Sequence, residues 1–354
     1  MKKSHAFLGI VISLLFLILA FRESDFGQIL EQMQGLKAWP LLLSLPILFS
    51  AYGVRVIRWR YLLLPLGKIK YHTLFSSIMI GFMSLNILPF RLGEFVRAFV
   101  LGRHTNLSKS SVFATIIIER IFDGFAMIFI MLTSLSFLPF SLGESTLDWV
   151  RFFAYLGLVI FLFGLALVLL IRLKYPAIIR LVEKLPFLSP RIRRKTVRII
   201  QSFAAGLSII GGFRRFITIT LWSLLVWVVT ALYYWMVMYS FMNTSGGSLG
   251  SEAGFAGSLF LTGALAVGIM IPAGPAFIGT FELACIAALA ALGIAAPIAE
   301  SYAIVVHAVQ FLPITLTGLL YLYFQEFNLK EIRAGGEETQ EGVREAGTGA
   351  DGSE

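Results

Sequence analysis

The chain has 354 residues, of which 58% are hydrophobic and only 14% are charged. A soluble domain carries about 25% charged residues, so the composition excludes an ordinary soluble protein and predicts an all-α, multi-pass (polytopic) membrane protein. Lys and Arg outnumber Asp and Glu by 29 to 20, which basic cytoplasmic loops and anionic lipid headgroups explain without a nucleic-acid partner. The single cysteine, Cys285, excludes a disulfide framework and a cysteine-based metal cluster.

Apolar runs alternate with short polar segments along the whole chain. About 20 residues are needed to cross the hydrocarbon core. The runs long enough to matter are residues 6–21, 38–57, 72–88, 111–139, 149–172, 216–241, 253–271, 278–292 and 300–325. The first run follows a basic start like that of a signal peptide, but no small-residue cleavage site comes after it. We therefore expect it to remain as the first membrane helix.

Loop charges predict how these runs cross the membrane. Lys2 and Lys3 place the N-terminus in the cytoplasm, and the basic residues of 55–70, Arg55 and Arg58 among them, then also fall inside. A single crossing by 72–88 would put the basic block 172–198 outside, against the positive-inside rule. A hairpin over 72–102 restores the rule; two tight crossings would do so equally, but the short second arm favours re-entry.

The second half of the chain contains a similar hairpin, residues 253–292, whose connection IPAGPAFIGT carries no charge. Each half then has two helices, a broken hairpin and a third helix. This predicts about six full transmembrane helices plus two re-entrant hairpins in an inverted-topology repeat, an arrangement that puts substrate sites between the halves. The first repeat spans 1–140 and the second spans 141–327.

Two further segments complete the predicted organisation. Residues 176–210 have apolar positions at three- and four-residue spacing among basic residues, which fits either an amphipathic helix on the anionic inner leaflet or a basic linker. The tail, 328–354, is acidic and Gly-rich, and we predict that it is disordered. With an odd number of crossings in each half, both termini are expected on the cytoplasmic side of the cell membrane.

Helix-breaking residues mark both hairpins. They are Pro89 and Gly93 in the first, and Pro272, Gly274, Pro275 and Gly279 in the second. Pro and Gly interrupt backbone hydrogen bonding, which a membrane tolerates only where the freed groups find other partners. The breaks therefore predict polar sites enclosed by protein.

The first hairpin carries charge where an apolar run ends, in the segment NILPFRLGEFVR from Asn86 to Arg97. A charge at the bilayer centre costs about 2.5–3.5 kcal/mol on insertion scales, so such residues face protein or a water-filled cavity. Arg91, Glu94 and Arg97 share one face if they are helical. The two arginines either present guanidinium groups to a phosphate while pairing with Glu94, or merely neutralise it.

A second charged cluster lies inside the run 111–139. Glu119 and Asp123 are one turn apart, and Arg120 can reach Asp123 at i+3. At 1.5 Å per residue, Asp123 falls about 18 Å from the start of this helix, near the middle of the membrane. The cluster is either a salt bridge that locks this helix to the hairpin, or a proton relay or headgroup contact.

Glu282 lies near the start of the second hairpin's return arm, shortly after Gly279. The positive end of a helix dipole favours a carboxylate there, either as a cap or beside a ligand. His307 and Gln310 in the last run are interpreted as interhelical hydrogen-bond partners rather than ligands.

These motifs resemble the lysylphosphatidylglycerol synthase transmembrane (flippase-like) family. The resemblance rests on 86–97 followed by ERIFD at 119–123, on 272–282 as a second signature, and on R-x-x-R-W at 55–59. The archetype, the multiple peptide resistance factor, joins this module to a cytosolic aminoacyltransferase domain, and the module is taken to move the modified lipid. We expect this chain to be a stand-alone membrane module, for which the resemblance implies lipid translocation and argues against aminoacylation.

The sequence thus predicts a lipid flippase-like transporter that moves a phospholipid or other phosphate-bearing lipid between leaflets. Arg91 and Arg97 would bind the headgroup phosphate, and Glu94, Glu119 and Asp123 would organise them. One alternative is a non-catalytic membrane partner of a separately encoded lipid-modifying enzyme or glycosyltransferase. The other is a membrane-embedded transferase, for which the sequence shows no catalytic motif; we expect no enzyme activity, no cofactor and no bound metal.

Overall fold

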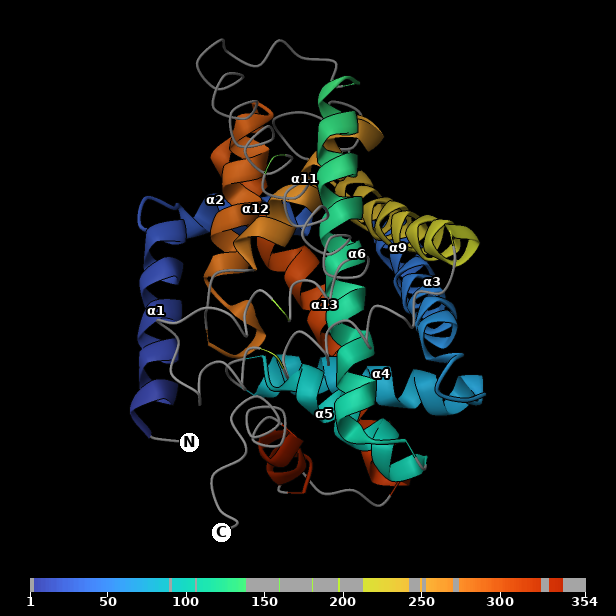
Figure 1. Ribbon diagram of the computed structural model, residues 1–354. Helices are drawn as coiled ribbons and strands as arrows, with labels where there is room; N and C mark the ends of the chain where they lie inside the picture. Colours follow the sequence, from blue (N-terminus) through green and yellow to red (C-terminus); the bar gives the residue numbers. More distant parts are fainter. Residues whose placement is uncertain are drawn as a thin grey trace.

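The computed structural model describes residues 3–88, 91–105, 107–137, 213–241, 253–269, 274–325 and 331–339, with the single positions 159, 180, 197 and 249. Every regular element within these ranges is helical (Figure 1), as the all-α prediction requires. Four of the expectations fall outside the described residues. They are the helix at 149–172, most of the segment 176–210, Pro89 and Pro272.

Three of the described helices are long and apolar enough to cross a membrane: α3 (Ala38–Leu63), α9 (Phe213–Tyr239) and α13 (Ala296–Phe324). They have 26, 27 and 29 residues, against the roughly 20 needed. Large apolar side chains are exposed on all three, as lipid-facing positions would be; examples are Leu42, Leu221 and Leu316. A fourth helix, α6 (Lys109–Leu135), has 27 residues and carries the predicted second charged cluster.

Both predicted hairpins are present as pairs of short, packed helices. The first pairs α4 (Tyr71–Ile87) with α5 (Gly93–His104), and α4 runs across the view in Figure 1 while α1 and α6 run up it. The second pairs α11 (Gly254–Gly268) with α12 (Thr280–Ala291). The total of six crossings plus two re-entrant hairpins, and the orientation of the termini, stay predictions.

A single turn of 3₁₀ helix, η1 (Pro275–Phe277), precedes α12 and lies between the two halves of the chain. It contacts α4 of the first hairpin and also α1 (Lys3–Phe21). The backbone N–H of Gly274 donates to Ser13 Oγ of α1 at 2.8 Å. Helix α13 in turn packs against α4 and α12. Each hairpin is therefore held by a helix from the other half of the chain.

The N-terminal region continues into a short helix, α2 (Phe26–Gln34), which begins at an Asp25 cap. The Asp25 carboxylate accepts hydrogen bonds from the N–H groups of Gly27 and Gln28, as N-cap residues do. Helix α2 packs on α13, where Ser301 Oγ donates to the carbonyl oxygen of Ile29 at 3.1 Å. This contact fixes α1 and α2 against the second half of the chain.

Part of the acidic tail is ordered, contrary to its predicted disorder. Residues 331–339 are helical, and Ile332 is fully buried against α5 and its neighbours. Glu338 forms an ion pair with Lys109 at 2.9 Å. The apolar anchor Ile332 and the ion pair with Lys109, at the start of α6, thus order a segment whose composition indicated a solvated chain. Residues 340–354 lie outside the described part.

Gly93 allows α4 and α5 to approach each other closely. A Cβ atom at Gly93 would lie 2.2 Å from the carbonyl oxygen of Gly81 and 2.5 Å from the backbone N of Leu85. Small residues at such crossings let helix backbones meet, which is how helices associate in membranes. Gly93 therefore has a packing role in addition to its predicted role as a helix-breaking residue.

Gly93→Ala is expected to lower the free energy of unfolding by about 1–3 kcal/mol, because an added methyl group in a filled contact displaces the backbone. Gly124 on α6 is the matched control, since a Cβ there meets nothing within 4 Å. Gly124→Ala should be neutral or stabilise by up to about 1 kcal/mol. Denaturation of both variants in mixed micelles measures the difference, and equal stabilities would contradict the close approach.

Candidate functional site

A buried network of arginines and carboxylates joins α3, α5, α6 and α9. At its centre, Arg58 on α3 forms two hydrogen bonds with Asp123 of α6, and its Nη2 lies 3.0 Å from Glu119 Oε1. All three side chains are buried. From α9, Trp227 donates its indole N–H to Asp123 Oδ1 at 2.9 Å, and Ser223 Oγ accepts from Arg58 Nη1 at 3.0 Å. The carboxylates are thus fully engaged within the protein.

Arg97 adds the first hairpin to this network. Its guanidinium binds Glu119 in bidentate fashion, at 3.0 Å and 2.8 Å, and lies 3.7 Å from the centre of the Trp59 ring. Arg97 is 3% exposed. The sequence suggested that Arg97 pairs with Glu94 and presents donors to a phosphate; instead its donors are used by Glu119, because its side chain turns toward α6.

Arg120 connects the buried network to a cavity. Its Nη2 lies 2.7 Å from Glu119 Oε1 and 3.3 Å from Asp123 Oδ2, so the predicted i+3 pair is present. Its Nε is 3.9 Å from Glu94 Oε1. The Arg120 side chain is 31% exposed, whereas the other members of the network, Arg58, Arg97, Glu119 and Asp123, are buried.

Arg91 bridges the two hairpins. It stands before α5 with a φ of 55°, so it does not continue the helical face of Glu94 and Arg97. Arg91 Nη1 donates to the carbonyl oxygen of Ile269, at the end of α11, at 3.0 Å. Its Nη2 lies 3.6 Å from Glu94 Oε1, which is the part of the predicted trio that the structure retains.

Asn86, at the end of α4, is a further predicted site residue that contacts the second half of the chain. Its side-chain N–H donates to Thr315 Oγ1 on α13 at 2.8 Å. Asn86 also lines the same cavity as Arg91 and Arg120. Together, the contacts of Asn86 and Arg91 place the end of α4 and the start of α5 directly against the second hairpin and the last helix.

Glu282 caps α12, as one of its two predicted roles requires. Its Oε2 accepts the N–H of Gly279 at 2.6 Å, and its Oε1 is hydrogen-bonded to His307 Nδ1 of α13. The Phe281 ring lies 4.4 Å from the His307 ring centre. Gln310, one turn along α13, accepts from Tyr234 of α9 at 3.2 Å. His307 and Gln310 are therefore interhelical hydrogen-bond partners, as expected.

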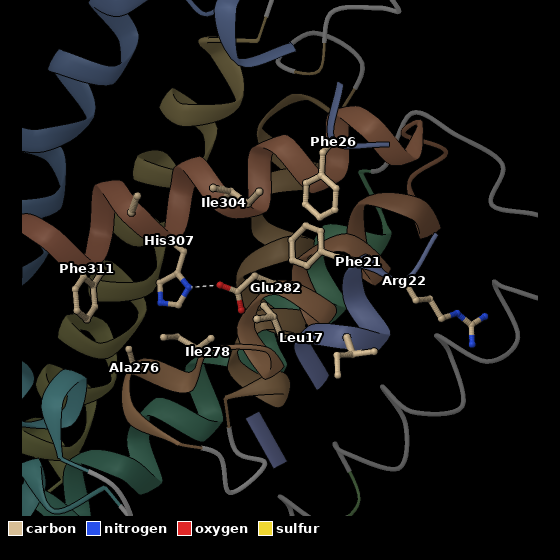
Figure 2. Close-up of a pocket in the computed structure, with 12 residues that line it drawn as sticks. Leu17, Phe21, Arg22, Phe26, Ala276, Ile278, Glu282, Ile304, His307 and Phe311 are labelled. Atoms are coloured by element: carbon tan, nitrogen blue, oxygen red, sulfur yellow. Dashed lines mark hydrogen bonds and ion pairs between the residues drawn. The ribbon is translucent and has the colours of Figure 1, made fainter. Parts of the chain in front are cut away.

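Two adjoining cavities lie beside these residues. The arginine cavity, about 120 Å³, is lined by Arg55, Arg91 and Arg120 together with other polar and aromatic side chains. The lateral cavity, about 660 Å³, is bounded by α1, η1, α12 and α13 and is mostly apolar. Figure 2 shows the lateral cavity, with the Glu282–His307 pair on its wall among apolar side chains. Three residues line both cavities: Ala276, His307 and Phe311.

Arg55 and Arg58 are site residues that the sequence reasoning missed. It counted them with the cytoplasmic loop charges, yet both belong to α3, which continues to Leu63, and both are buried. Their three-residue spacing was the available signal, since it puts both side chains on one face of a helix that runs on past the apolar segment.

Packed helical hairpins, a buried arginine network and an apolar lateral cavity define a membrane-embedded protein with a polar site enclosed between its two halves. Residues 6–318 match the model of the family described as Lysylphosphatidylglycerol synthase TM region, and the chain belongs to this family. The resemblance noted in the sequence is thereby confirmed.

The chain is also similar to a UPF0104 membrane protein of the archaeon Methanothermobacter thermautotrophicus. The two are 29% identical over 110 residues, a stretch that covers 29% of this chain and 32% of that protein. The chain thus spans about a third of the length of this relative.

Proposed function

We propose that this protein moves a phosphate-bearing lipid between the two leaflets of the cell membrane, and that it acts as a transporter rather than an enzyme. The observation that carries the proposal is that the arginine cavity and the lateral cavity share Ala276, His307 and Phe311 as common walls. A lipid has the same two parts side by side, a charged headgroup and apolar chains. Membership of the family supports a role in lipid metabolism.

The charges of the site suit a phosphate group. Arg91 and Arg120 line the arginine cavity, and guanidinium groups bind phosphate oxygens in pairs. Glu94, Glu119 and Asp123 hold these arginines, which is the organising role proposed for the three acids. Arg97 lines neither described cavity. We therefore assign Arg97 to positioning Glu119 and not to the headgroup.

The lateral cavity suits the acyl chains. It is bounded by apolar side chains of α1, η1, α12 and α13, such as Leu17, Ile278 and Ile304 (Figure 2). Acyl chains that enter this cavity leave bilayer hydrocarbon rather than water, so an apolar lining can receive them without a desolvation cost while the headgroup occupies the arginine cavity. In this proposal the Glu282–His307 pair stands where headgroup and chains meet.

Reconstitution into liposomes tests the function. Fluorescent phosphatidylglycerol, phosphatidylethanolamine and a neutral glycolipid with the same chains are compared by quenching from the outside. We expect the protein to speed exchange of the two phosphate-bearing lipids but not of the glycolipid. Arg91→Ala should slow this exchange, and Arg91→Lys should restore only part of the rate, because an ammonium lacks the planar fork of a guanidinium.

Arg214 on α9 provides the matched control, since it is exposed and lines neither cavity. Arg214→Ala should exchange lipid like the wild type. If the wild-type protein accelerates exchange of none of the three lipids, translocation is wrong. The chain would then be better explained as a non-catalytic membrane partner of a lipid-modifying enzyme.

A further inference from the structure

Arg55, on α3, is a buried cation that has no hydrogen-bond acceptor among the described residues. It is 7% exposed, and the described part of the chain offers its guanidinium neither a hydrogen bond nor an ion pair. Its neighbours are aromatic: the ring centres of Trp227, Phe82 and Tyr52 lie 4.8, 5.7 and 5.8 Å from its Cζ. The adjacent arginine Arg58, by contrast, is bonded to two carboxylates.

Aromatic rings do not complete the bonding of a guanidinium. Cation–π contact attracts the charge through the ring face, but a guanidinium has five N–H donors that need acceptors. A buried polar group without a hydrogen bond is unfavourable, and a buried unpaired charge is more so. The Arg55 environment therefore positions a cation while leaving its donors for something outside the protein chain.

The charges around Arg55 indicate whether the ligand that accepts its hydrogen bonds is an anion or a cation. The network and the arginine cavity contain five arginines: Arg55, Arg58, Arg91, Arg97 and Arg120. Among the described residues they face three carboxylates, Glu94, Glu119 and Asp123. Arg55 shares the cavity wall with two other arginines, Arg91 and Arg120. Asp123, the carboxylate whose charge acts on Arg55, is already bonded to Arg58, Arg120 and Trp227. The cavity thus has an excess of positive charge, and its ligand is an anion.

The cavity also decides the kind of anion. Arg55, Arg91 and Arg120 line one small space of about 120 Å³, which polar side chains such as Asn86 and Gln310 also line. Guanidinium groups fit oxyanions through two parallel N–H bonds. A tetrahedral phosphate offers several oxygens and can therefore bind more than one of these arginines at once.

We propose that Arg55 is the principal binding residue for a phosphate group in the arginine cavity, with Arg91 and Arg120 as secondary contacts. The assignment of that phosphate to a lipid headgroup rests on the proposed function; a free phosphate ion shares the same chemistry. Arg55 is a better candidate than Arg97, because Arg97 lines neither described cavity and both of its terminal nitrogens already bind Glu119.

The test uses Arg55→Met, which keeps an unbranched side chain and removes its charge, and Arg55→Lys, which keeps the charge. Arg60→Met is the control, because Arg60 lies on the same helix, bonds to Tyr71 and lines neither cavity. The full chain is purified in neutral detergent and freed of lipid. Its thermal midpoint is measured alone, with inorganic phosphate, and with short-chain phosphatidylglycerol, against chloride at equal ionic strength.

Without ligand, Arg55→Met should unfold at the same or a higher temperature than the wild type, because it removes a buried charge that is bonded to no carboxylate among the described residues. Short-chain phosphatidylglycerol should raise the wild-type midpoint by mass action. Arg55→Met should bind it roughly tenfold more weakly or worse, the effect of losing bonds to a charged group. Arg55→Lys should be intermediate, and Arg60→Met should bind as the wild type does.

Three results would overturn the inference: unchanged phosphate or lipid binding by Arg55→Met, no binding of either by the wild type, or marked destabilisation of ligand-free Arg55→Met. Stabilisation by inorganic phosphate alone, lost in Arg55→Met, supports the site and identifies free phosphate as its ligand. The two proposals fail separately. Lipid exchange that Arg55→Met leaves intact contradicts only the role of Arg55, whereas Arg55-dependent binding without lipid exchange contradicts only translocation.

Discussion

Glu119→Gln is expected to lower the free energy of unfolding by about 3–5 kcal/mol, the loss typical when one partner of a buried ion pair is removed. Glu119 is fully buried and contacts Arg58, Arg97 and Arg120 at 2.7–3.0 Å. A neutral amide leaves Arg97 without a carboxylate partner among the described residues and adds to the positive excess of the network. Denaturation in mixed micelles, with the wild type alongside, measures this loss.

Glu94 offers a matched control for this prediction. It carries the same carboxylate, is partly exposed, and lies 3.6 and 3.9 Å from its arginine partners. Glu94→Gln should cost about 1 kcal/mol or less, as exposed ion pairs do. Adding Arg97→Met to Glu119→Gln should recover part of the stability, because it removes the cation that the first change left unpaired. Equal effects of Glu119→Gln and Glu94→Gln would show that the network does not stabilise the fold.

Ala308→Trp is expected to abolish lipid exchange while leaving the protein folded. Ala308 lies on α13, one residue from His307, and lines the lateral cavity. It is exposed, so an indole added there extends into the cavity rather than into packed side chains. The indole would take the space proposed for the acyl chains, and exchange should fall to the rate of protein-free vesicles. The same liposome assay measures the change.

Leu320→Trp controls for the effect of a tryptophan on α13 itself. Leu320 lies on the same helix, is 57% exposed and lines neither cavity. That variant should exchange lipid like the wild type, and both variants should keep the thermal midpoint of the parent protein. Normal exchange by Ala308→Trp would mean that the acyl chains do not use the lateral cavity. The walls shared by the two cavities would then no longer support lipid translocation.

The sequence alone determined those features of this protein that depend on local pattern. Apolar runs of 20 residues or more predicted α3, α9 and α13, because the thickness of the membrane sets the length of a crossing helix. Breaks at Gly93 and Gly279 predicted the two hairpins, since Pro and Gly interrupt backbone hydrogen bonding wherever they occur. The family followed from the same local motifs.

The partners of the buried charges were decided only by the tertiary structure. Asp123 binds Arg58, 65 residues away, and Glu119 binds Arg97, 22 residues away on another helix. The sequence pattern predicted that Arg97 pairs with Glu94, and it counted Arg58 among the cytoplasmic loop charges. Which buried ion pairs form depends on which helix faces meet. That in turn depends on close contacts such as that of Gly93 with Gly81.

The two cavities likewise belong to the tertiary structure. The lateral cavity is the space left between α1, η1, α12 and α13, elements from both ends of the chain. The arginine cavity brings together Arg55, Arg91 and Arg120 from three elements of the first half with Gln310 from the last helix. The sequence determined which side chains have charges to bury. Only the packing of the two halves decided which of those charges has no hydrogen-bond partner within the described part of the chain, because tertiary contacts determine which acceptors surround a donor.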